Sequence, residues 1–191
     1  TKSQAILLTA DQMAGFSAIQ LSAIADVIKY ISTDALNGIS SAAISGCIFY
    51  LTSDQIHILS LDQIAGISSK LISYIQSSLT LEQFQGINIH AIPYLRVQLL
   101  TSEQLNYLTA DGQIAHLSNS QIYSLTRDQI QALTGDWLSL INNNAISALH
   151  IEWLTHEQLT ALTSNEINNL TPIQIQSIDP LYLSEDAKFV L

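Results

Sequence analysis

The sequence predicts an all-α fold built as a solenoid of very short capped helices. Three observations favour it. A motif of about eight residues recurs along most of the 191-residue chain. Each copy has the residue types of a helix start in the right order. The apolar positions alternate in spacings of five and three, whereas a strand needs a period of two. Recurrence at a short fixed period is typical of repeat architectures.

The repeat has the form Leu-Thr-x-x-Gln-Ile-x-x, as in LTSEQLNY from Leu100 and LTRDQIQA from Leu125. Two further copies, beginning at Ile31 and Ile39, are degenerate. The leading apolar residues of the clear copies are Leu8, Phe16, Leu51, Leu59, Leu79, Leu100, Leu108, Leu117, Leu125, Leu133, Leu154, Leu162, Leu170 and Ile178.

Each copy contains the signals that begin a helix. Thr101 occupies an N-cap position and Gln104 follows three residues later, which is the spacing of a capping box. Leu100 and Leu105 have the spacing of a hydrophobic staple. Pro172 and Pro180 each occupy a first helical position, where the missing N–H costs nothing. An isolated helix this short is unstable in water, so we expect neighbouring units to share one continuous core.

The acidic residues have a structural interpretation. Many fall at the second helical position of a copy, where a carboxylate is stabilised by the helix dipole. The spacing of a calcium loop is not found. The residues assigned to this position are Asp11, Asp34, Asp54, Asp62, Glu82, Glu103, Asp111, Asp128, Asp136, Glu157 and Asp186.

A longer pattern lies over the short one. The segments IFYLT, IPYLR and IEWLT place Tyr50, Tyr94 and Trp153 in equivalent positions, each after a less regular stretch. We interpret residues 1–191 as one array with super-repeats of roughly 8–50, 51–99, 100–153 and 154–191, punctuated by longer, more buried helices. Asn142-Asn143-Asn144 is the clearest expected loop, because Asn tolerates a left-handed conformation.

Composition excludes several classes of protein. Charged residues make up only 12% of the chain and the net charge is −10, with six Lys and Arg against sixteen Asp and Glu. Nucleic acid is therefore not an expected partner, because phosphate binding needs clustered positive charge. The mean hydropathy is +0.27, but no segment has the roughly 20 mostly apolar residues of a membrane span. A single cysteine, Cys47, excludes an internal disulfide framework. The absence of an initiator Met or a signal peptide favours a processed chain or a piece of a longer protein.

The residues of a catalytic, cofactor or metal site do not gather in the sequence. The five histidines are scattered, and no HExxH, GxSxG, GxGxxG or phosphate-binding loop occurs. Cys47 lies in an apolar setting, which predicts a buried thiol rather than a nucleophile. We expect no enzymatic activity, no cofactor, no metal and no small-molecule substrate.

The aromatic residues allow two interpretations. Anchoring in the core is the default for Trp137 and Trp153. The alternative is an exposed aromatic row that contacts a partner. The candidate contact residues are Tyr107, Tyr123, Trp137 and Trp153.

The LTxxQIxxL units from Leu100 to Leu133 and from Leu154 to Ile178 resemble two groups of proteins. One is the tandem LTxxQIxxLT segments of large bacterial surface and secreted proteins that are described as adhesin-like. The other is the mesothelin and stereocilin family, whose short helices are expected to form an armadillo-like superhelix. The resemblance implies a superhelical fold and no catalytic residues. The many cysteines of the secreted mammalian members are missing here, and the Ile, Asn, Gln and Ser richness favours the bacterial group.

The sequence leads to three hypotheses about function, two of them non-enzymatic and one enzymatic. The first is a structural or binding array of a secreted or surface bacterial protein, which acts as a scaffold, an adhesin segment or a unit that associates end to end with copies of itself. The second is a solenoid that recognises a host protein as part of a bacterial effector in the host cytosol. The third is an enzyme with an unrecognised site, which needs convergent polar groups in a pocket.

Overall fold

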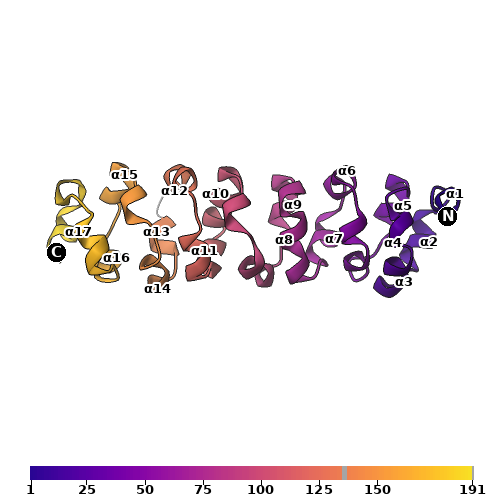
Figure 1. Ribbon diagram of the computed structural model, residues 1–191, viewed down its shortest axis with the longest axis horizontal. Coiled ribbons are helices and arrows are strands. Elements are labelled where there is room, and N and C mark those ends of the chain that lie inside the picture. Colours follow the sequence, from indigo (N-terminus) through magenta and orange to yellow (C-terminus); the bar gives the residue numbers. More distant parts are fainter. Residues whose placement is uncertain (135–136, 191) are drawn as a thin grey trace. The chain divides into compact units, whose positions relative to one another are not determined.

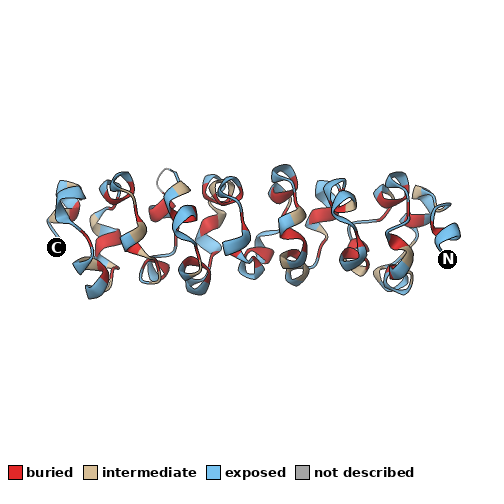
Figure 2. Cartoon of the chain, turned by 45° about the horizontal axis from the view of Figure 1, so that its top comes forward, coloured by how far each residue is buried: buried red, intermediate tan, exposed pale blue. Residues whose placement is uncertain are grey.

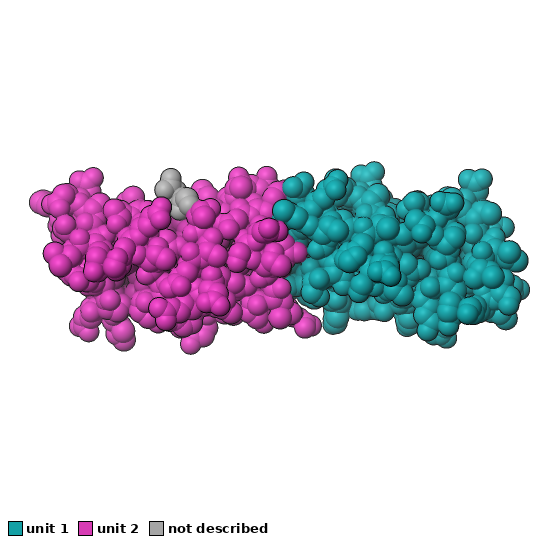
Figure 3. All heavy atoms as spheres, turned by 90° about the horizontal axis from the view of Figure 1, so that it is seen from above, with its two compact units in different colours: residues 1–95 teal, residues 96–191 magenta. Residues whose placement is uncertain are grey.

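The computed structural model describes residues 1–134 and 137–190. Within these residues 64% of the chain is helical and no strand occurs, which confirms the all-α class. The chain divides into two compact units, Thr1–Leu95 and Arg96–Leu191 (Figure 3). Each unit is described by itself, and the four super-repeats stay a prediction.

Both units consist of short α-helices joined through 3₁₀ turns (Figure 1). The helices of unit 1 are α1 (Lys2–Ala5), α2 (Ala10–Ala14), α3 (Ala18–Ala23), α4 (Ala25–Ile28), α5 (Thr33–Asn37), η1 (Ile44–Gly46), η2 (Ile48–Tyr50), α6 (Ser53–His57), α7 (Leu61–Ala65), η3 (Ser69–Leu71), α8 (Ile72–Ile75), η4 (Gln76–Ser78), α9 (Leu81–Gln85) and η5 (Ile89–Tyr94). The helices of unit 2 are η6 (Val97–Leu99), α10 (Ser102–Ala110), η7 (Gln113–His116), α11 (Asn119–Tyr123), α12 (Arg127–Ala132), α13 (Trp137–Leu140), α14 (Asn143–Ile146), η8 (Ile151–Trp153), α15 (His156–Thr160), α16 (Ser164–Asn168), α17 (Pro172–Gln176), η9 (Pro180–Tyr182) and α18 (Glu185–Lys188).

The predicted capping boxes are present. In α10 the Thr101 hydroxyl accepts from the Gln104 N–H at 3.2 Å, and Gln104 Oε1 accepts from the Thr101 N–H at 3.0 Å. The same reciprocal pair begins α2, α3, α6, α7, α9, α11, α12, α15, α16 and α17. Pro172 begins α17 and Pro180 begins η9, as expected.

Much of the core consists of the leading residues of the repeats and the residues that follow the capping Gln, although the first two leading residues, Leu8 and Phe16, are half-buried (Figure 2). Leu100 and Leu105, the two residues of the predicted staple, are both buried. Each fully buried Leu or Ile contributes roughly 1.5–3 kcal/mol relative to an exposed one. Because each helix presents only one or two such residues, its stability comes from neighbouring helices rather than from its own length.

Neighbouring helices are linked by the amide group of the capping Gln. Gln63 Nε2 donates to the Leu36 and Ile39 carbonyls at 3.0 and 2.8 Å, which joins α7 to the end of α5. The capping Gln residues that donate to two earlier carbonyls in this way are Gln63, Gln83, Gln129, Gln158 and Gln174. In unit 2 these bonds connect α12 to η6 and α15 to α12. Figure 1 accordingly shows α10, α12 and α15 in succession along one edge of that unit.

Glycines allow helices in unit 1 to approach closely. A Cβ built on Gly38 would lie 2.1 Å from the Ala10 carbonyl oxygen, and one on Gly46 would lie 2.1 Å from that of Ala18. Consequently α5 packs on α2 and η1 packs on α3 with backbone against backbone.

Three sequence expectations about local structure were wrong. Asp111 does not begin a helix, because α10 continues through Thr109, whose buried hydroxyl donates to the Leu105 carbonyl. This copy has nine residues, and Gly112, at φ 70°, takes up the extra residue. Asn142 is not in a left-handed loop, since its side chain accepts from the Asn144 N–H and begins α14.

The third error concerns the less regular stretches. They contain short 3₁₀ turns such as Ile44–Gly46 and Ile151–Trp153 rather than longer buried helices. These stretches lack the Thr and Gln that begin an α-helix at a fixed position. The acidic residues otherwise occupy the second helical position as predicted, apart from Asp136, which lies outside the described residues.

Candidate interaction surface

Residues with reactive side chains do not converge in the part of the chain that the structure describes. No group of three His, Cys, Asp or Glu there could hold a metal ion. Cys47 is buried as expected, and burial raises the pKa of its thiol to about 12. A thiol with this pKa stays protonated at neutral pH and is a poor nucleophile.

The sequence predicted no membrane-spanning segment, and the helices of the structure can be compared with that prediction. Among the described helices, none is both long enough and apolar enough to cross a bilayer.

The four candidate contact residues have different environments. Trp137 is 0% exposed, so it is a core residue and cannot contact a partner at the surface. Among the residues that the structure describes, its indole Nε1 has no hydrogen-bond partner. Tyr107 is half-buried on α10, and burial, with a smaller contribution from the Asp111 carboxylate, raises the pKa of its phenol. Tyr123 is 63% exposed and Trp153 is half-buried.

Tyr123 and Trp153 belong to one cluster, because His150 lies between them. The His150 ring stacks on the Trp153 ring with centroids 3.9 Å apart and an interplanar angle of 17°. The Tyr123 ring lies 4.8 Å from the His150 ring, tilted by 38°. We call these three residues the ring stack. Its outer member, Tyr123, is the most exposed.

Backbone and side-chain hydrogen bonds hold the ring stack in place. His150 Nδ1 lies 3.1 Å from Glu152 Oε1, and Gln131 Nε2 donates to the Trp153 carbonyl at 3.1 Å. Helix α11, which carries Tyr123, packs on α14 and η6, and α12 packs on η8. The rings are therefore ordered before any partner arrives.

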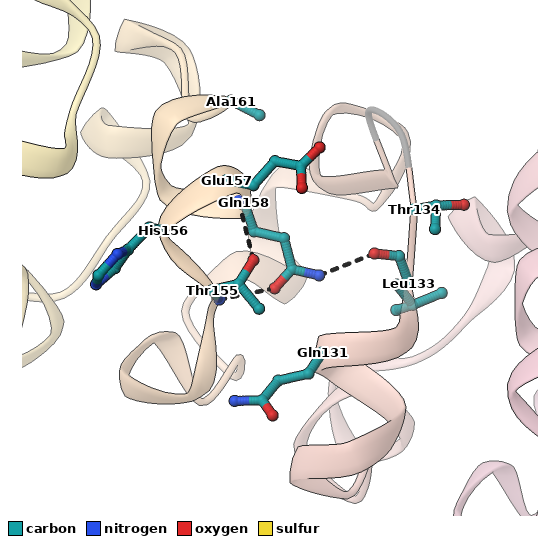
Figure 4. Close-up of a pocket in the computed structure, with 8 residues that line it drawn as sticks. All are labelled: Gln131, Leu133, Thr134, Thr155, His156, Glu157, Gln158 and Ala161. Carbon is teal, nitrogen blue, oxygen red and sulfur yellow. Dashed lines mark hydrogen bonds between the residues drawn. The ribbon is translucent and has the colours of Figure 1, made fainter.

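Unit 2 also has an open cleft, whose lining includes Gln131, the residue that donates to the Trp153 carbonyl. It has a volume of about 460 Å³, and α15 borders it opposite Gln131, Leu133 and Thr134 (Figure 4). The buried Gln158 amide crosses its floor to the Leu133 carbonyl at 2.9 Å. The lining residues are Gln131, Leu133, Thr134, Thr155, His156, Glu157, Gln158 and Ala161. His156, on its rim, stacks on Tyr182 with centroids 3.7 Å apart.

Unit 1 has exposed aromatic residues of its own. Phe49 and Tyr74 make an edge-to-face contact with centroids 4.9 Å apart, and both are more than half exposed. Tyr50 and Tyr94, which hold the places equivalent to Trp153 in the longer pattern, are 47% and 43% exposed and are therefore not core residues. The Tyr30 ring has two cations close to it, with Lys2 Nζ at 4.8 Å and Lys29 Nζ at 5.3 Å from its centroid.

Sequence reasoning missed His150 and Phe49 as surface residues. Their partners are 27 residues before His150 and 25 residues after Phe49, which is the separation of the Gln-to-carbonyl hydrogen bonds. A search for aromatic pairs at this spacing would have found both clusters.

Comparison with known proteins gives no relative for this chain: no family model, no curated protein and no solved structure matches it.

Proposed function

We propose that the chain is a non-enzymatic structural and binding array whose short helices wind as an armadillo-like solenoid. The observation that carries this proposal is the repeated link from a capping Gln to two carbonyls 24–32 residues earlier. A link of the same kind at each turn is the connectivity of a solenoid, in which a repeat contacts only its neighbours.

A location in a secreted or surface protein of a bacterium fits the LTxxQIxxL resemblance and the surface chemistry. Ser, Thr, Gln and Asn are common among the exposed residues, and only 12% of the chain is charged. Such a surface suits a scaffold, an adhesin segment or a unit that packs against its own copies. Repetition gives many weak contacts, whose combined avidity exceeds that of one contact.

A second candidate function is recognition of one protein partner, as in an effector that acts in a host cytosol. The ring stack favours it, because exposed aromatic residues gathered in one place are typical of binding hot spots. The two functions differ in the partner, which is a second copy of the chain in the first case and another protein in the second.

Light scattering during size-exclusion chromatography across a wide concentration range tests the choice. A mass of 20.9 kDa at every concentration favours recognition of another protein. Growth into larger species favours self-association. Tight binding of a single small molecule, found by screening metabolites for a thermal shift, would contradict both functions.

A further inference from the structure

We propose that the ring stack, together with Glu152, is a docking surface for an arginine-bearing segment of a protein partner. This proposal rests on the proposed binding function and names the chemistry of the partner. The site lies within unit 2 and uses three elements, the end of α11, the residue before η8, and η8 itself.

The geometry of the ring stack fits a flat cation. A guanidinium group stacks on an aromatic face and at the same time donates to a carboxylate. Tyr123 offers aromatic surface, since it is 63% exposed while its ring contacts that of His150. Glu152 offers the carboxylate, since its side chain is 49% exposed while one oxygen faces His150 Nδ1.

The charge of the chain is complementary to a basic partner. Residues 96–191 contain ten of the sixteen acidic residues and three of the six basic ones. Long-range attraction of this sign accelerates association with a basic segment. The ring stack then supplies the short-range specificity that net charge lacks.

A simpler contact between a cation and a tyrosine ring, without a paired carboxylate, already occurs within the chain. In unit 1 the ring of Tyr30 is 36% exposed and lies under two lysine ammonium groups. Tyr123 is more exposed than Tyr30, and no cation lies over its ring among the described residues. Because the stack is ordered by its internal contacts, binding costs little side-chain entropy at this surface.

Fluorescence anisotropy with the full chain and a labelled peptide of four arginines alternating with glycine tests the proposal. We expect Tyr123→Ala to weaken binding by about tenfold, since a desolvated cation–π contact contributes on the order of 1–2 kcal/mol. Tyr123→Phe keeps the ring and should keep binding. Glu152→Gln should weaken binding severalfold.

Matched controls separate this site from diffuse attraction. Tyr74→Ala removes an exposed tyrosine of unit 1, and Glu103→Gln removes one charge elsewhere in unit 2. Both should change affinity by less than about twofold. A peptide with lysine in place of arginine should bind more weakly, because ammonium cannot stack on a ring and pair in a bidentate manner.

Three results would overturn the proposal: no binding of the arginine peptide, equal binding of the arginine and lysine peptides, or equal losses from Glu103→Gln and Glu152→Gln. Circular dichroism of each variant verifies that it is folded. Failure of the peptide to bind a folded chain overturns only this partner, whereas a tight small-molecule ligand overturns the array function itself.

Discussion

The capping Gln has two structural roles at the residue level. Its Oε1 accepts from the N-cap N–H of its own helix, as Gln83 does from Thr80 at 3.1 Å. Its Nε2 donates to two carbonyls of an earlier turn, here those of Ile56 and Leu59 at 2.7 and 2.9 Å. The Ile56 carbonyl also accepts from the Leu59 N–H at 3.1 Å at the end of α6, and the Leu59 carbonyl lies beyond that helix end, where intrahelical donors run out. One neutral side chain thus satisfies groups on two helices.

Replacing Gln83 by Glu separates these roles. The carboxylate can still accept from Thr80, but it cannot donate, and it places charge beside two buried carbonyls. We expect the free energy of unfolding in urea to fall by about 2 kcal/mol or more. Gln12→Glu is the matched control, because Gln12 has the same cap but is exposed. Equal effects of both variants would show that the earlier turn contributes nothing.

Glu166 allows the reverse substitution, in which a carboxylate at the capping position is replaced by an amide that can donate to an earlier helix. It is 3% exposed and occupies the capping-Gln position of α16, where it accepts from the Thr163 N–H at 2.8 Å. An ionised carboxylate has no N–H for the preceding turn. We expect Glu166→Gln to raise the free energy of unfolding by about 1 kcal/mol, measured by urea denaturation at neutral pH. A decrease would mean that the bond from the Thr163 hydroxyl to the carboxylate dominates.

At the level of the helices, close packing depends on glycine at two helix ends, where a side chain would have no space. Gly38 follows α5 and Gly46 ends η1, and each meets the backbone of the helix that lies 28 residues earlier in the sequence, at Ala10 and Ala18. Their φ values are ordinary, so the requirement is for space. Gly112 is the opposite case, with open space around it and a left-handed backbone.

Gly38→Ala should therefore be destabilising, because its Cβ would lie 2.1 Å from a backbone oxygen that cannot move alone. The expected loss is about 2–3 kcal/mol, typical of overpacking, seen in thermal or urea unfolding. Gly15→Ala is the control, since the nearest atom would be 3.6 Å away. That variant should be neutral or slightly stabilising. An unchanged Gly38→Ala would show that α2 and α5 separate readily.

Much of the helix pattern was predictable, because Thr, Gln and Leu at fixed spacing form the capping box and the staple with residues of the same helix. The start of α10 at Thr101 follows from local chemistry alone. The contacts between helices far apart in the sequence were not predictable. Nothing in the residues around Gln63 indicates that its Nε2 donates to the Leu36 carbonyl. Trp137 and Tyr123 also needed the structure, because burial of a ring depends on which helices lie beside it.

At the level of the whole chain, electrostatic attraction contributes little to stability. The net charge is −10 with neutral histidines, because sixteen carboxylates face six basic side chains. The Lys188–Glu185 ion pair lies at the surface, where such a pair adds little to stability. Repulsion between carboxylates is therefore not offset, and it opposes the compact state.

Added salt should stabilise the chain by screening this repulsion. We expect Tm to rise by a few degrees between low salt and 0.5 M NaCl, since 1 kcal/mol corresponds to roughly 2–4 °C for a chain of this size. Differential scanning calorimetry measures the shift. A fall in Tm would mean that attractive pairs outweigh the repulsion.

The double use of the capping amide also bears on how such a chain can grow. If the chain is the solenoid proposed above, a duplicated stretch that spans one turn carries its own helix start and its own donor for the turn before it. It also carries the carbonyls that accept from the turn after it. Gene duplication can thus lengthen the chain by whole turns without any compensating change elsewhere, and the length of the protein becomes a variable that selection can adjust separately from its fold.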